Sequence, residues 1–171
     1  MQILCNTSTM HLDDMPLDIG YASEEVSLKD KQGKAHQLGG HTGKTQLIIT
    51  LPYIDDSFKQ ELEDIAKDLS KGGVHEVDAS IIVANDKHDS PQIEGFDFYI
   101  DEEEEFADYY GVKLRGQPYE GELTKAIILI SKDGAIFYDE FSPDINKGFN
   151  TATLARKVLA AQECYTGKGC H

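Results

Sequence analysis

The sequence predicts an α/β fold, and three segments carry this prediction. Residues 46–51 form a short apolar run rich in β-branched side chains, which is typical of a strand buried on both faces. Residues 57–69 then place apolar side chains at helical spacing, so that one stripe of a helix faces the sheet. Residues 125–130 and 135–139 flank a short turn and predict a β-hairpin. We therefore expect a buried sheet with helices packed against it.

The remaining segments extend this pattern along the chain. They are an N-terminal strand or hairpin in residues 1–20, a small sheet element or a loop at 26–28 and 36–38, strands at 77–84 and 96–100, a short helix that the acidic run 101–105 opens, and a last helix from Asn150 or Thr151. A parallel β-α-β start, followed by an antiparallel hairpin and a closing helix, is the order of elements in the thioredoxin fold.

The turn between the first buried strand and its helix is the place where we expect chemistry. Pro52 ends the strand, because proline cannot donate a hydrogen bond to a sheet. Ser57 and Gln60 fit a capping box at the start of the helix. A helix N-terminus offers free N–H groups and the positive end of the helix dipole, which makes it a common functional position in α/β proteins.

The composition excludes several classes of partner. The 171 residues include 31 acidic and 16 basic side chains, for a net charge of -15, which argues against nucleic acid and anionic membranes as partners. No apolar run approaches the ~20 residues of a membrane span, and the first residues lack the features of a secretory signal. We expect a cytoplasmic protein with one domain over residues 1–163 and a flexible tail over 164–171.

The chain has three cysteines, too few for a disulfide scaffold: Cys5, Cys164 and Cys170. Two glycines lie between Cys164 and Cys170, so a disulfide between them is sterically easy. The pair is a candidate redox pair, an incidental pair or, with His171, a metal site. Cys5 reads as a small packed residue rather than a nucleophile. The histidines show no metal-binding spacing, and we expect no metal and no cofactor.

Several residue runs, most of them in the C-terminal third, are specific enough to indicate a family. They are Tyr110-Gly111-Val112, residues 125–130, Lys132-Asp133-Gly134, Tyr138 and residues 141–146, with residues 25–28 and 51–55 earlier in the chain. In spacing and character these runs resemble the bacterial thiol peroxidases of the peroxiredoxin superfamily, over about residues 17–160. The resemblance implies a thioredoxin-like fold with an N-terminal β-hairpin extension, thiol-peroxidase oxidoreductase activity, a thioredoxin-like reductant and a homodimer.

The chain departs from that family at the reactive turn. In such enzymes the turn reads P-x-x-x-T-x-x-C, and an arginine helps to hold the cysteine as a thiolate. Pro52 matches the proline, but Asp56 stands at the threonine position, Lys59 at the cysteine position and Lys125 at the arginine position. An ammonium group cannot attack a peroxide as a thiolate does. We therefore hypothesise that the conventional peroxidatic mechanism is absent, with Asp55 and Asp56 accepting the helix amides instead.

Two functional hypotheses from different classes follow. In the first, thiol–disulfide chemistry has moved to Cys164 and Cys170. In the second, the protein is a non-catalytic binding protein that takes a partner or a small anion on the former active-site face. Lys59 is either a reactive amine or, as we expect, a lysine on the solvent side of the helix. Lys125 is either a weak anion-binding residue or an ordinary lysine at a strand end.

Overall fold

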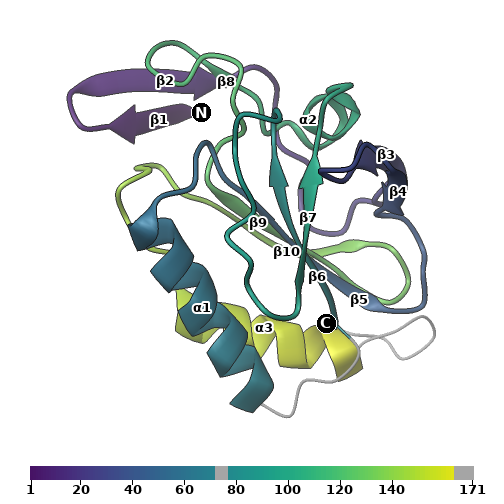
Figure 1. Ribbon diagram of the computed structural model, residues 1–171. Helices are drawn as coiled ribbons and strands as arrows, with labels where there is room; N and C mark the ends of the chain where they lie inside the picture. Colours follow the sequence, from purple (N-terminus) through teal and green to yellow (C-terminus); the bar gives the residue numbers. More distant parts are fainter. Residues whose placement is uncertain (72–76, 164–171) are drawn as a thin grey trace.

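The computed structural model describes residues 1–71 and 77–163 and consists of two sheets and three helices (Figure 1). The elements are β1 (Gln2–Cys5), β2 (Ser8–Leu12), β3 (Val26–Lys29), β4 (Ala35–Leu38), β5 (Thr45–Thr50), α1 (Asp56–Lys71), β6 (Val77–Val83), β7 (Phe96–Ile100), α2 (Glu105–Tyr110), β8 (Leu114–Arg115), β9 (Ala126–Ile130), β10 (Ile136–Phe141) and α3 (Thr151–Glu163). Cys164 and Cys170 lie outside the described residues.

The main sheet has seven strands in the order β10-β9-β5-β6-β7-β3-β4. Strand β5 pairs in parallel with β6, and β6 pairs in parallel with β7. Helix α1 is the crossover connection between β5 and β6. Strand β9 pairs antiparallel with both β5 and β10, which confirms the predicted hairpin. The β3–β4 hairpin joins the far edge of the same sheet. This mixed sheet is the α/β architecture that the sequence predicts.

The central strand β5 separates two hydrophobic cores. Because successive side chains of a strand point to opposite faces, Leu47 and Ile49 lie in one core and Ile48 lies in the other. Helices α1 and α3 cover the first face, where they contact each other (Figure 1), and α2 contributes to the second core. All three side chains are fully buried, which explains the continuous apolar run in this segment.

The two long helices are amphipathic, as their sequence spacing predicts. Helix α1 buries Phe58, Leu62 and Ile65, and α3 buries a stripe that includes Leu154 and Val158. Within residues 1–71 and 77–163, no helix is both long enough and apolar enough to span a membrane.

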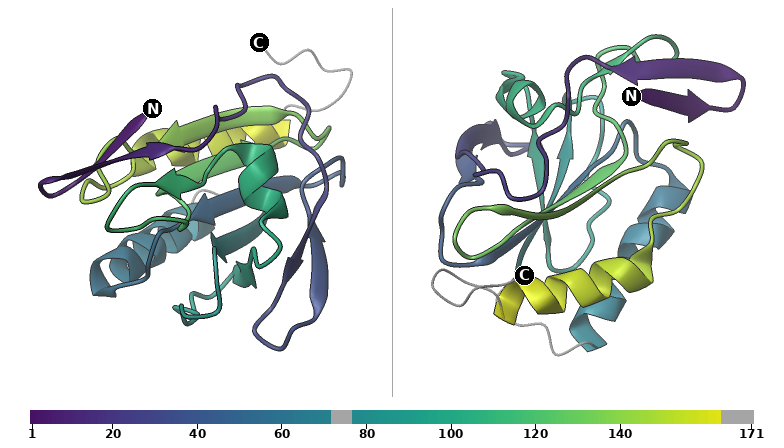
Figure 2. Two further views of the ribbon diagram at one scale, coloured as in Figure 1. Left: turned by 90° about the horizontal axis from the view of Figure 1, so that it is seen from above. Right: turned by 180° about the vertical axis from the view of Figure 1, so that it is seen from behind.

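The N-terminal hairpin of β1 and β2 pairs with β8 and projects from the body of the molecule (Figure 2). Ile3 and Met10 are fully buried on its inner side. The amide of Leu4 donates to the carbonyl of Pro143 over 2.8 Å, and the amide of Ile145 donates to the carbonyl of Leu4 over 2.9 Å. The hairpin is therefore attached to the loop that leads from β10 to α3.

Candidate functional site

The start of α1 is capped by Asp55. The Asp55 Oδ1 atom accepts the amide hydrogen of Phe58 over 2.8 Å, and the helix begins at the next residue, Asp56. The prediction of a capping box at Ser57 and Gln60 is wrong. The helix already begins at Asp56, and Asp55, two residues before Ser57, accepts the amide hydrogen of Phe58. The role expected for Asp55, as an acceptor of a helix amide, is the one that the structure shows.

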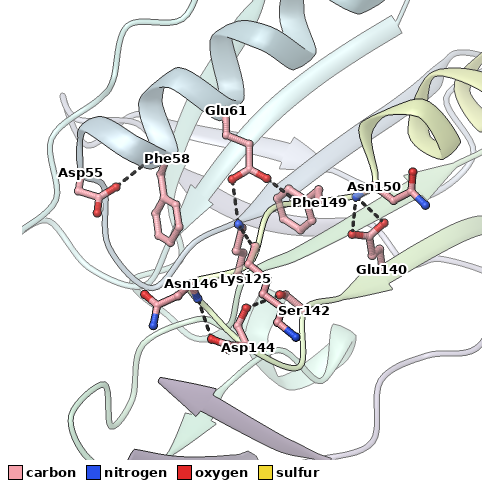
Figure 3. Close-up of polar contacts among 11 residues, drawn as sticks. Asp55, Phe58, Glu61, Lys125, Glu140, Ser142, Asp144, Asn146, Phe149 and Asn150 are labelled. Atoms are coloured by element: carbon pink, nitrogen blue, oxygen red, sulfur yellow. Dashed lines mark hydrogen bonds and ion pairs between the residues drawn. The ribbon is translucent and has the colours of Figure 1, made fainter. Parts of the chain in front are cut away.

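Lys125 occupies a buried position directly before β9, with 1% of its surface exposed. Its Nζ atom donates to Glu61 Oε2 over 2.8 Å and to the carbonyl of Lys147 over 2.6 Å (Figure 3). The same atom lies 4.9 Å from the centre of the Phe58 ring and 4.7 Å from that of Phe149. Lys125 thus lies at a strand end, as one of the two expectations has it, but it is buried and its charge is paired with Glu61.

Glu61 in α1 hydrogen-bonds to two other segments of the chain. Its Oε2 atom accepts from Lys125, and its Oε1 atom accepts the amide hydrogen of Phe149 over 2.6 Å. One carboxylate from α1 therefore binds both the start of β9 and the loop that precedes α3. A buried pair of this kind adds little net stability, but the loss of one partner leaves an uncompensated charge.

A cavity of about 400 Å³ opens in front of this ion pair, where α1 and α3 begin. Its lining residues are Tyr53, Asp55, Ser57, Phe58, Glu61, Lys125, Asn146, Gly148, Phe149 and Thr151. Phe58 and Phe149 are buried, whereas Asp55, Ser57 and Asn146 are exposed. The cavity therefore has aromatic inner walls and a polar rim.

Of the four positions that the sequence resemblance singles out, only Lys125 lines the cavity. Pro52 is buried at the end of β5, as predicted. Asp56 and Lys59 are exposed, and the Lys59 side chain makes no hydrogen bond or ion pair with the described part of the chain. Lys59 lies on the solvent side of α1, as expected.

Sequence reasoning missed Glu61 and Phe149 as site residues. A weak signal for Glu61 was present, because it lies three residues after Phe58 and so borders the apolar stripe of α1. A carboxylate at that edge needs a partner when it is partly buried. The partner, Lys125, is 64 residues away along the chain, and no spacing rule reaches that far.

Cys5 lies near Tyr53 in the turn after β5 but does not line the cavity. It is 4% exposed, and its thiol lies near the Tyr119 hydroxyl. The Tyr119 ring lies 4.9 Å from the ring of Tyr53, which does line the cavity. Burial, followed by the nearby Cys5 thiol, raises the pKa of Tyr119. This thiol therefore lies behind the cavity wall that Tyr53 forms and not in the lining.

Two histidines each lie beside one carboxylate. The Nε2 atom of His36 lies 2.8 Å from Asp30 Oδ2, and that of His88 lies 2.9 Å from Glu122 Oε2. Across residues 1–71 and 77–163, no group of three or more His, Cys, Asp or Glu side chains is placed to hold a metal ion.

Comparison with known proteins gives a consistent set of relatives. No protein-family model matches the chain. A thiol peroxidase from Campylobacter jejuni is 27% identical over 164 residues, which cover 91% of this chain and 90% of that protein.

Among solved structures, a peroxiredoxin-like protein from Aquifex aeolicus matches with a TM-score of 0.80 at 21% identity, covering 94% of this chain and 96% of that one. A thiol peroxidase from Chromobacterium violaceum matches with a TM-score of 0.78 at 16% identity, covering 95% and 97%. These matches confirm the predicted resemblance and the thioredoxin-like fold.

Proposed function

We propose that this chain, which has the peroxiredoxin fold and is similar to bacterial thiol peroxidases, uses the cavity at the start of α1 to bind a small molecule rather than to reduce peroxide. In this proposal the conventional peroxidatic cysteine is absent, and the former reactive turn forms one wall of a binding site.

The buried pair of Lys125 and Glu61 is the observation that supports this proposal most directly. Reduction of a peroxide by cysteine needs a thiolate and a cation that stabilises negative charge beside it. Glu61 and the carbonyl of Lys147 already occupy the Lys125 ammonium, so it is not available for that task. The lining of the cavity, as far as the structure describes it, contains no sulfur atom.

Stopped-flow measurement of peroxide consumption tests this proposal. We expect the protein to consume hydrogen peroxide no faster than an equal concentration of free cysteine. A Lys59→Cys variant should remain slow, because a thiol at this exposed position would lie outside the cavity that Lys125 lines. Rapid peroxide consumption by the unmodified protein would refute the proposal.

Thiol–disulfide chemistry at Cys164 and Cys170 is a second candidate, and it rests on the sequence alone. These cysteines form the chain's one closely spaced pair, and both lie outside the described residues. In this candidate function a thioredoxin-like reductant restores the two thiols, and the protein forms a homodimer as the resemblance implies.

Thiol titration before and after peroxide treatment, followed by mass spectrometry, distinguishes the two candidates. A Cys164–Cys170 disulfide that forms on treatment supports the redox function, and Cys164→Ser is the matched control. Unchanged thiols support the binding function. Sedimentation analysis of the same samples reports whether the protein is a dimer.

A further inference from the structure

We infer that the cavity at the start of α1 binds a small organic cation, an amine whose ammonium group pairs with Asp55. This inference rests on the proposed binding function and names its ligand class. The charge of this ligand is opposite to that of the small anion that a former peroxidatic site would be expected to bind.

Lys125 cannot serve as the anion-binding group of this cavity. An ammonium has three N–H donors. Two of them are committed to Glu61 Oε2 and to the carbonyl of Lys147, and the group lies between the rings of Phe58 and Phe149. An anion at the third donor would lie beside the Glu61 carboxylate, which repels it and already neutralises the Lys125 charge.

Asp55 is the charged group that remains available. Its Oδ1 atom accepts the Phe58 amide hydrogen, whereas its Oδ2 atom accepts no hydrogen bond from the described residues. Asp55 is exposed at the rim of the cavity, and Figure 3 shows it on the same side of the site as Asn146. A carboxylate can accept several hydrogen bonds at once, so this one can cap α1 and bind an ammonium together.

The positive groups at the cavity are already matched by carboxylates. Asp55 and Glu61 line it, and they stand against the Lys125 ammonium and two helix N-termini, each equivalent to roughly half a positive charge. Glu140 accepts the amide hydrogen of Asn150 over 3.0 Å and so satisfies part of the positive end of α3. These groups are close to balanced in charge, which leaves the Oδ2 atom of Asp55 to select the charge of the ligand. The net charge of -15 on the whole chain adds to the attraction of cations.

The aromatic walls favour an amine that carries an apolar body. Tyr53 and Phe149 line the cavity, and the Tyr53 ring stacks on Phe58 with centres 4.8 Å apart. Pockets for small molecules commonly combine such apolar walls with one charged group that fixes orientation. An aromatic or aliphatic amine can place its body against these rings while its ammonium reaches Asp55.

A matched series of ligands tests the inference. The probes are 2-phenylethylamine, 2-phenylethanol and 3-phenylpropanoate, which share a phenylalkyl body and differ in the charge of the head group. Affinities are measured by NMR titration of the backbone amides, with Ser57 and Gly148 as reporters in the cavity wall. We expect the amine to bind about tenfold more tightly than the alcohol, and the carboxylate to bind most weakly.

Two aspartate variants provide the matched control. Asparagine caps helices as well as aspartate does, so Asp55→Asn should leave α1 intact while it removes the charge. We expect Asp55→Asn to weaken binding of the amine about tenfold and to leave binding of the alcohol unchanged. Asp56→Asn removes the same charge from the neighbouring residue, which does not line the cavity, and should change the affinity less than twofold.

The possible outcomes separate the inference from the proposed function. If the carboxylate binds more tightly than the amine, or if all three probes bind equally, the cation inference is wrong and the binding function stands. If no probe shifts the amides of the cavity wall, both are wrong. Equal weakening of amine binding by Asp55→Asn and Asp56→Asn would also overturn the assignment of Asp55.

Discussion

At the scale of single residues, the pair of Lys125 and Glu61 shows how one buried ion pair shapes a cavity. A lysine ammonium is a compact charge that a single carboxylate can neutralise, whereas an arginine offers five donors in a fixed fork. With 1% of Lys125 exposed, its charge is stable only while Glu61 and the Lys147 carbonyl remain in place. The pair therefore fixes both the structure and the polarity of the cavity.

Removal of Glu61 should be strongly destabilising. Glu61→Ala leaves the Lys125 ammonium buried without its charged partner and the Phe149 amide without an acceptor. We expect the free energy of unfolding to fall by about 3 kcal/mol, as measured by urea denaturation. The double variant Glu61→Leu and Lys125→Met removes both charges and should recover most of this loss. A single variant as stable as the unmodified protein would show that solvent, rather than Glu61, satisfies Lys125.

At the scale of elements, the short helix α2 depends on one buried carboxylate at the end of β7. Asp101 is 2% exposed and accepts the amide hydrogens of Phe106 and Ala107 over 2.9 and 2.8 Å. Burial raises the pKa of Asp101 to about 6, although both hydrogen bonds act in the opposite direction. The cost of desolvating the charge is therefore larger than the gain from capping.

This shift in pKa predicts a pH-dependent stability. Because the folded-state pKa lies above the unfolded value of about 3.9, the stability that the protonated carboxyl adds is fully present below about pH 4. It is lost as the pH rises through about 6. Urea denaturation at pH 4 to 7 should show this loss in the unmodified protein and a smaller one in Asp101→Asn. Parallel pH profiles for the two proteins would contradict the assignment.

The elements also show what the sequence could predict and what it could not. Alternation and apolar runs predicted the strands, because Leu47, Ile48 and Ile49 must each face one of two cores. The capping-box motif points to Ser57 and the carboxylates point to Asp55 and Asp56, and motif rules do not decide between such adjacent polar residues. The contact between Lys125 and Glu61 depends on how β9 and α1 pack, which local patterns do not encode.

At the scale of the whole molecule, the N-terminal hairpin holds the loop that forms one wall of the cavity. The backbone hydrogen bonds of Leu4 hold residues 143–145, and this loop continues directly into Asn146 and Gly148 of the cavity wall. Cys5 lies at the end of β1 on the buried side of the hairpin. The accessibility of its thiol therefore reports how firmly the hairpin is attached.

We expect the Cys5 thiol to react only when the structure opens. In a variant with Cys164→Ser and Cys170→Ser, Cys5 is the single remaining thiol, so its reaction with a disulfide reagent is followed without interference. At 4% exposure it should react less than about one thousandth as fast as in the unfolded chain.

The dependence of this rate on urea shows how the thiol becomes exposed. If the hairpin separates from the core by itself, the rate will be nearly independent of low urea concentrations, because little surface is exposed. If opening requires global unfolding, the rate will rise steeply with urea, in step with the unfolding equilibrium. We expect the steep dependence, because Ile3 and Met10 belong to the same core as α1. A thiol that reacts in native buffer as fast as free cysteine would instead place Cys5 at an open site.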